Sequence, residues 1–558
     1  MSAYVLRRSL LSVGVLAAFL AGAGAVLVVL GVPVWVPAVG AVALVGTEYA
    51  ISPRLVEWLI PANVVDRHGD RYVTEHRIGD IVAQRCRQSS VPLVKLGIID
   101  DGTPNAFSFG HTRRDARIWV SRGLLERLND DELDAVVCHE IGHVANRDFV
   151  VMTAAAAVPM ILYYLYLGAR VSRRAHSILV VIGAYAGFFV SQLAVLALAR
   201  AREYGADHHS CAVTGNGDAM ASALVKVAYG MGQIDANRAA QARELRESAK
   251  DKSSSEKRAA HEEAAQVARQ GHRMLAARML GIADPSQGAA MVVACEEGMA
   301  ADEVMGAMRW ELCNPWGRFQ EKLSSHPIVV RRIAALERSG LAGAPTHWSA
   351  TRVEGACDRA ELRGARRRFL PELVLRYTGP ALLIVAVLAE EVHDWRVVAW
   401  SLLAGGLAMV ARTMYRDPLT APEPVDRVTS LLTRLDASPI RGLPVSVRGR
   451  VIGRGTPGYV LSPDLVVQDQ SGFVPVLYRQ PFPGARSFFA TLRAGRYADQ
   501  EVLVHGWYRR GPAPVLELRD ITAADGTTSR SRQWVAAYLL SVAILLPGLL
   551  MVAWFVSA

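Results

Sequence analysis

The sequence lacks paired cysteines. Its six cysteines are scattered along 558 residues, and no two of them form a Cys-x-x-Cys pair. This spacing predicts neither a disulfide framework nor a zinc site built from cysteines. The six are Cys86, Cys138, Cys211, Cys295, Cys313 and Cys357.

Charged side chains are also scarce. They make up 20% of the residues, whereas hydrophobic residues make up 51%, which is high for a soluble protein and indicates membrane spans. The formal net charge of +10 comes mostly from arginine. In a membrane protein such an excess marks cytoplasmic segments, and nucleic-acid binding is the competing explanation.

Apolar runs that are long enough, or nearly so, to cross about 30 Å of hydrocarbon occur as three pairs and one single segment. Arg7 and Arg8 favour a cytoplasmic N-terminus, whereas the small residues 21–23 leave a cleaved signal peptide as the alternative. We therefore expect a mainly α-helical, polytopic membrane protein with about seven spans. Only the loop around Arg173 and Arg174 then breaks the positive-inside rule. The runs are Ser9–Leu30, Val32–Thr47, Val150–Leu167, Ser177–Leu198, Leu373–Ala389, Val397–Val410 and Trp534–Val556.

A metal-binding pattern occurs at His139-Glu140-Ile141-Gly142-His143. Positions i and i+4 share one face of an α-helix, so both imidazoles can reach one ion. Glu140 lies one step round the helix, where it can take a proton from a metal-bound water. H-E-x-x-H is the arrangement of zinc peptidases, and the alternative is a surface helix with two solvated histidines.

A catalytic zinc site needs a third protein ligand and an open fourth position. Glu203 and Asp207 are again i and i+4, so one carboxylate can bind zinc while the other accepts the N–H of a zinc-bound imidazole. A predicted membrane hairpin separates the two motifs and returns them to the same side of the membrane. The alternatives are a solvated acidic pair balanced by nearby arginines, or ligation by His208 or His209, which point off this face.

The stretch around the histidine pair resembles the integral-membrane zinc metallopeptidases that include HtpX and the CAAX prenyl endopeptidases. The resemblance covers about residues 1–340, and the order of spans and metal motifs is similar to that of the HtpX branch. It implies a zincin-like α+β catalytic domain that holds one Zn²⁺. The matching segments are residues 104–110, 118–125 and 128–143, Glu203-x-x-x-Asp207, and residues 324–327 and 332–336.

This resemblance implies a role for each matching residue. His139, His143 and Glu203 would bind zinc, which lowers the pKa of its bound water toward about 7. Glu140 would act as general base and then as general acid.

Three further residues receive substrate roles from the same resemblance. Asn105, on an edge strand, would pair with the substrate backbone by strand addition. His326 and Arg332 would contact the substrate carbonyl and the developing oxyanion. Without the resemblance, Asn105 is a turn residue after Pro104 and His326 is a helix-capping residue next to Pro327.

Residues 420–530 depart from the HtpX pattern. Five short segments alternate or cluster like strands, and turn signals divide them, which predicts a small all-β, OB-like barrel. OB folds suggest nucleic acid, but arginines of a membrane-tethered segment more often face anionic lipid. We expect a regulatory or protein-docking module and no nucleic-acid partner. The segments are Val445–Ile452, Leu465–Asp469, Phe473–Tyr478, Glu501–Tyr508 and Val515–Leu518.

The expected protein is a plasma-membrane zinc endopeptidase that cuts membrane or misfolded polypeptides at the cytoplasmic face, as in protein quality control. One alternative is a prenyl-protein endopeptidase, which needs an enclosed intramembrane chamber. The other is a non-catalytic membrane scaffold with a structural zinc site. The expected domains are a transmembrane hairpin (1–51), a catalytic domain (52–345) with hairpin 150–199 and charged helical insertion 234–282, a third hairpin (373–411), the barrel (420–530) and a final span (534–557).

Overall fold

The computed structural model describes residues 35–228, 304–454, 464–481 and 494–557, apart from 75, 103, 172–176, 307, 392, 498 and 512–513. These residues divide into two compact units, and each is described by itself. The first unit contains residues 35–228 and 319–351, and the second contains 304–318 and 352–557. The first apolar run, the loop around Arg173 and the charged insertion 234–282 lie outside the described residues.

The first unit contains a four-stranded sheet with the order β1-β4-β6-β5. Its strands are β1 (Asn63–Val64), β4 (Lys95–Ile99), β5 (Ala106–Phe109) and β6 (Arg117–Ser121). β4 and β6 run parallel, whereas β1–β4 and β5–β6 are antiparallel. Buried aromatic rings of β5 and β6 pack together, with Phe109 edge-on to Trp119 at 4.8 Å. β5 forms one edge of this sheet.

Helix α5 (Asp130–Ala145) lies against β5 and against helix α3 (Ile78–Gln88). It begins at a capping box, in which the Asn129 side chain accepts from the Glu132 amide and the Glu132 side chain accepts from the Asn129 amide. Acidic residues in the first turn also suit the positive end of the helix dipole. The start of α5 is therefore fixed by its sequence, and so is the direction of its histidines. A hairpin, β2 (Arg67–His68) and β3 (Arg71–Tyr72), and the short helix α4 (Arg122–Arg127) complete this region.

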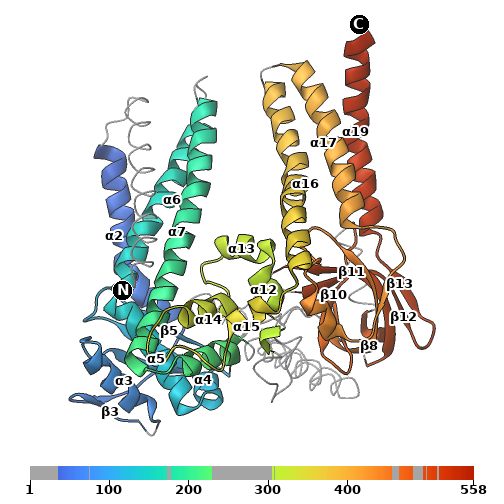
Figure 1. The fold of residues 1–558 in the computed structure, drawn as a ribbon. Helices are drawn as coiled ribbons and strands as arrows, with labels where there is room; N and C mark the ends of the chain where they lie inside the picture. Colours follow the sequence, from blue (N-terminus) through green and yellow to red (C-terminus); the bar gives the residue numbers. More distant parts are fainter. Residues whose placement is uncertain are drawn as a thin grey trace, which may run out of the picture. The chain divides into compact units, whose positions relative to one another are not determined.

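Three long helices of the first unit are α2 (Trp35–Leu59), α6 (Asp148–Val171) and α7 (Ser177–Thr214). α6 and α7 lie side by side (Figure 1), with Ala155, Val158 and Leu198 among the buried residues between them. α7 has 38 residues and is therefore about 57 Å long, well beyond a hydrocarbon core. One continuous helix thus carries both an apolar span and the predicted zinc carboxylate. Helix α14 (Val329–Glu337) contacts α7.

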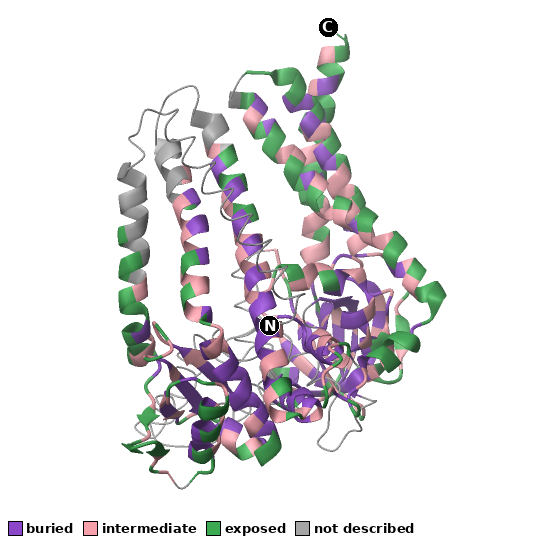
Figure 2. Ribbon diagram, turned by 60° about the vertical axis from the view of Figure 1, so that its left-hand side comes forward, coloured by how far each residue is buried: buried purple, intermediate pink, exposed green. Residues whose placement is uncertain are grey.

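In the second unit, three long helices form a bundle, α16 (Arg359–Glu391), α17 (Trp395–Arg416) and α19 (Gln533–Ser557). A Cβ at Gly548 would lie 2.3 Å from the Leu403 backbone, so α17 and α19 touch where only glycine fits. Apolar residues such as Leu370, Leu407 and Leu550 remain exposed on this bundle, and they suit a lipid environment. Figure 2 shows many exposed positions along its helices. Short helices α12 (Arg309–Cys313), α13 (Pro315–Lys322) and α15 (Ala350–Gly355) precede the bundle.

Cys313 and Cys357 of the second unit form a disulfide that joins the end of α12 to the segment just before α16. The sequence did not indicate this pair, because the two cysteines are 44 residues apart. The expectation of no disulfide is wrong at this pair. Cys86, Cys138 and Cys211 are free and buried.

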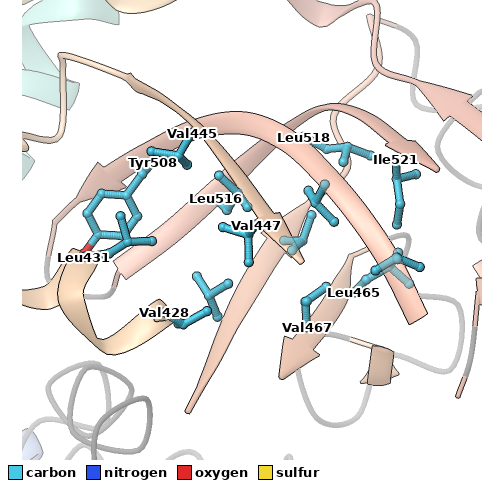
Figure 3. Packing of buried hydrophobic residues seen from close by; sticks show 14 of the residues in the cluster. Val428, Leu431, Val445, Val447, Leu465, Val467, Tyr508, Leu516, Leu518 and Ile521 are labelled. Atoms are coloured by element: carbon cyan, nitrogen blue, oxygen red, sulfur yellow. The ribbon is translucent and has the colours of Figure 1, made fainter. Parts of the chain in front are cut away.

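The rest of the second unit is a β-barrel, and Figure 3 shows part of its core. Its core contains mainly valine and leucine from alternate positions of every strand, such as Val445, Val447 and Leu516. β8 pairs with β9, β9 with β10, β10 with β12, β12 with β11, and β11 with β8, which closes the barrel. This is the strand order of an OB-type Greek-key barrel, and all five predicted strands are confirmed. The strands are β8 (Leu443–Arg454), β9 (Leu465–Gln468), β10 (Phe473–Leu477), β11 (Glu501–Arg510) and β12 (Pro514–Ala523), with short additions β7 (Glu423–Val425) and β13 (Thr528–Arg530) and 3₁₀ turns η1 (Val428–Thr433) and η2 (Ala494–Tyr497).

Among the described residues, four helices are long and apolar enough to cross a membrane: Gly183–Thr214 within α7, Arg359–Glu390 within α16, and α17 and α19. α5 and α6 bend by 61° at their junction and add a fifth if the pair is one span. The mainly helical membrane fold is confirmed, and the count of seven is not.

Candidate metal centre

Helix α5 directs His139 and His143 to one point. Their ring centroids are 4.8 Å apart, and their Nε2 atoms are separated by 3.1 Å. His139 is fully buried, whereas 14% of the His143 side chain is exposed. Glu140, between them, is buried, and no hydrogen bond or ion pair engages its carboxylate within the described part of the chain.

Helix α7 brings the Glu203 carboxylate to the same point. Its Oε2 lies 3.6 Å from His139 Nε2, and its Oε1 lies 3.6 Å from His143 Nε2. The two helices approach closely because Gly142 has no side chain. A Cβ there would be 3.2 Å from the Ala206 Cα atom and from the His209 side chain. The glycine of the histidine motif therefore sets the spacing between the metal-binding helices.

These three side chains fit a zinc ion. Ligand atoms about 2.0 to 2.1 Å from a tetrahedral zinc lie about 3.3 Å from each other. The separations of 3.1, 3.6 and 3.6 Å surround that value. Two imidazoles and one carboxylate are also a catalytic zinc set with one position left for water. The donor atoms of His139, His143 and Glu203 form such a group, all within 4.8 Å.

Asp207 orients the first histidine. Its Oδ1 lies 2.9 Å from His139 Nδ1, which leaves Nε2 directed at the metal position. Arg332 from α14 holds the same carboxylate, with Nε and Nη2 donating at 2.8 and 2.5 Å. Burial lowers the pKa of Arg332, but Asp207 and Glu203 outweigh burial and raise it, so the guanidinium stays charged. The i, i+4 pair of carboxylates thus lies where one can face the metal position and the other the His139 ring.

Asp148 orients the second histidine, and sequence reasoning missed it. Its Oδ2 lies 2.7 Å from His143 Nδ1, and its Oδ1 accepts from the buried Arg202 of α7. Arg202 also donates to the Asn146 carbonyl at 2.7 Å. The available signal was a carboxylate five residues after His143 at the start of a new helix. Each histidine therefore has its own carboxylate, and each carboxylate has its own arginine.

His326 lies beside the Glu203 carboxylate. Its Nδ1 is 3.4 Å from Glu203 Oε1. Arg332 differs from its predicted role. Its side chain is 0% exposed and its donors face Asp207, with Nη1 3.5 Å from Glu203, so these contacts give it a positioning role in place of a substrate contact. The physical reason is that a buried carboxylate without a charged partner is strongly destabilising. The Arg332 guanidinium is therefore engaged by the carboxylates of Asp207 and Glu203 and does not face a substrate.

Asn105 immediately precedes the edge strand β5. Its backbone amide donates to the Ser121 hydroxyl at 2.8 Å and its carbonyl accepts from the Ser121 amide, so its own backbone is held in the sheet. The edge strand beside the metal helix is the arrangement that strand addition requires. The alternative ligand His209 is directed elsewhere, because its Nε2 lies 3.0 Å from the Ser89 hydroxyl.

Fold and site together define an integral-membrane metallopeptidase. Residues 73–339 match peptidase family M48. The protease HtpX homolog of Methanothermobacter thermautotrophicus is 38% identical over 194 residues, covering 34% of this chain and 72% of the relative. Protease HtpX homolog 1 of Streptomyces coelicolor is 33% identical over 211 residues, covering 36% and 68%. Protease HtpX homolog 2 of Methanosarcina acetivorans is 32% identical over 201 residues, covering 34% and 67%.

The chain therefore belongs to the HtpX-like members of peptidase family M48. This confirms the resemblance that the motifs indicated. The family match ends at residue 339, so the candidate spans in α16, α17 and α19 and the barrel lie beyond it. No solved structure matches the chain.

Proposed function

We propose that this protein is a zinc endopeptidase that cleaves membrane or misfolded polypeptides at the cytoplasmic face of the plasma membrane, in protein quality control. The observation that carries the proposal is the convergence of His139, His143 and Glu203 on one point. Glu140 lies beside them, and its buried carboxylate has no hydrogen bond or ion pair within the described residues. A structural zinc site is closed by four protein ligands, and three donors favour catalysis over the scaffold alternative.

When bound, zinc would supply Lewis-acid activation of water and of the scissile carbonyl. Glu140 then accepts a proton from the attacking water and passes it to the leaving amine, so one carboxylate serves as base and acid. His326, 3.4 Å from Glu203, stabilises the developing oxyanion as a donor. Asp207 and Asp148 keep the two imidazoles in the tautomer that binds metal.

The substrate class follows from the strand beside the site. An extended peptide that pairs with the edge of β5 is recognised through its backbone, and this mode tolerates many side chains. Such a site suits unfolded segments of varied sequence. The alternative of a prenyl-protein endopeptidase needs an enclosed chamber within the membrane. A ring of membrane spans around the metal position would favour that alternative.

A seven-span topology with a cytoplasmic site is part of this proposal. Charge at the two ends of the second unit's bundle supports it. Arg367, Arg416 and Arg532 lie at or near the ends of the bundle helices that adjoin the barrel, whereas Glu390 and Asp394 lie at the other end. By the positive-inside rule the barrel end faces the cytoplasm. We assign the barrel a regulatory or protein-docking role.

The proposal is tested with the full chain in detergent and casein as an unfolded substrate. We expect cleavage that 1,10-phenanthroline abolishes and added zinc restores. Cleavage that resists the chelator would remove the metal from the mechanism. Zinc bound without any cleavage of casein or of a membrane-protein substrate would favour the scaffold alternative.

A further inference from the structure

One face of helix α16 packs inside the second unit. Ala365, Glu372, Gly379 and Ala386 recur every seven residues and are all buried. Glu372 accepts from the Trp316 indole at 2.6 Å and from the Tyr415 hydroxyl at 2.7 Å. These contacts fix the rotation of α16 about its own axis, and they therefore fix which residues point away from the bundle.

Four arginines lie on the opposite face. Arg359, Arg363, Arg366 and Arg367 are all exposed, and at about 100° per residue they fall within a sector of about 100° centred roughly 150° from Ala365. No acidic side chain pairs with any of the four among the residues that the structure describes. Four positive charges at this spacing repel each other, so the face gains from a partner that carries negative charge.

The same face becomes apolar in the next turn. Leu370, Val374, Tyr377 and Ile384 continue the exposed sector and are between 47% and 63% exposed. This apolar stripe lies within the candidate span Arg359–Glu390. At 1.5 Å per residue, Arg366 and Arg367 lie about 5 to 6 Å from Leu370 along the axis. That distance is comparable with the headgroup layer on each side of the hydrocarbon core.

We propose that this arginine face of α16 binds the phosphate groups of anionic phospholipids in the leaflet on the barrel side. A guanidinium is planar and always charged, and it can bind a phosphate through two hydrogen bonds. A basic cluster directly next to a membrane span is the arrangement that recruits anionic headgroups. We assign a lipid as the occupant because the arginines and the apolar stripe follow one another along the same face of α16. A phospholipid presents its charged headgroup and its apolar chains in the same order. The proposal rests on α16 crossing the membrane, as the proposed topology states.

Lipid binding here would act on the barrel as well, because the barrel is joined to the bundle by buried contacts. Arg416 at the end of α17 binds both oxygens of Glu517 at 2.9 and 3.0 Å. The Trp507 indole donates to the Pro418 carbonyl at 2.9 Å. Headgroups held by α16 therefore fix the depth of the bundle and, through it, the height of the barrel above the membrane.

The test uses the full chain in nanodiscs of phosphatidylcholine with 30 mol% phosphatidylglycerol. Lipids retained after mild detergent extraction are counted by native mass spectrometry. The variant replaces Arg363, Arg366 and Arg367 with glutamine. The control replaces three exposed arginines of the catalytic domain that adjoin no candidate span. Each variant lowers the formal net charge from +10 to +7. The control arginines are Arg71, Arg87 and Arg114.

The wild type and the control are expected to retain phosphatidylglycerol in preference to phosphatidylcholine. In the α16 variant this preference should fall, by about fivefold for each arginine removed, toward the nanodisc ratio. Preference that persists in the α16 variant, or that falls equally in both variants, overturns the proposal. So does a wild type that prefers a single-stranded oligonucleotide to phosphatidylglycerol vesicles. Casein cleavage by the same samples reports on the proposed function separately.

Discussion

Replacing Asp148 with asparagine tests the carboxylate that sequence reasoning missed. Asp148 accepts from His143 Nδ1 at 2.7 Å and is paired with the buried Arg202. Asparagine keeps the size of the side chain but removes its charge. Asp148 accepts from two donors, whereas asparagine has only one side-chain oxygen, so its NH2 group would point at the N–H of either the His143 imidazole or the Arg202 guanidinium. Loss of such a supporting carboxylate costs about 10- to 100-fold in metal affinity, which is about 1.4 to 2.7 kcal/mol.

The assay is competition for zinc between the purified protein and a chromogenic chelator. Asp115→Asn is the matched control, because Asp115 also lies next to a histidine ring nitrogen, 2.6 Å from His111 Nδ1, and also binds an arginine. The control should bind zinc as the wild type does. Equal zinc affinity of Asp148→Asn and the wild type would refute the role of Asp148. An equal loss in the control would refute the claim that the effect is specific to the metal centre.

Three further predictions follow from single residues. Glu203→Ala should bind less than one zinc per chain, and full zinc content would move the third ligand elsewhere. Gly142→Ala should weaken zinc binding and lower stability by about 1 to 3 kcal/mol, because its Cβ would meet Ala206 at 3.2 Å; an unchanged unfolding temperature would contradict the tight helix contact. Burial raises the pKa of Asp218, but hydrogen bonds from residues 346–348 outweigh it and lower the pKa. Asp218→Ala should therefore cost about 1 kcal/mol above about pH 4, and this difference in stability should shrink as pH falls below about 3.9, through the folded pKa.

The sequence predicted the barrel strands to within a few residues. Strands of a small barrel alternate in hydrophobicity and end at turn residues, so their bounds are local information. The observed β8 and β12 extend beyond the predicted Val445–Ile452 and Val515–Leu518. The added residues include Leu443, Ile521 and Ala523, which are buried in the barrel core, and in β12 the alternation is interrupted at Arg519 and Asp520, opposite a register shift in β11. Where each strand ends depends on its hydrogen bonds to a neighbouring strand. The sequence of a single segment does not reveal that pairing.

The proposed metal ligands could be named from the sequence because two of them share one helical pentapeptide. Their supporting residues were harder to find. Arg332 binds Asp207 from 125 residues away, and only the packing of α14 on α7 joins them. The resemblance gave Arg332 a substrate role, but burial against two carboxylates makes it a positioning residue.

Hydropathy located the spans but not the helices that contain them. The predicted run Leu373–Ala389 is the apolar part of α16, which begins 14 residues earlier at Arg359. Arginine, alanine and glutamate are good helix formers, so the helix continues where the apolar run does not. The first 14 residues of α16 carry the proposed lipid-binding arginines. Hydropathy alone would assign these residues to a loop, because they are polar.

The most direct test of the account is Glu140→Gln, with zinc content and casein cleavage measured on one preparation. Glutamine keeps the shape of the side chain but cannot accept the proton of the attacking water. The account predicts one zinc per chain, as in the wild type, and no cleavage. Cleavage at the wild-type rate with zinc in place would contradict the assignment of this centre as the site of peptide hydrolysis.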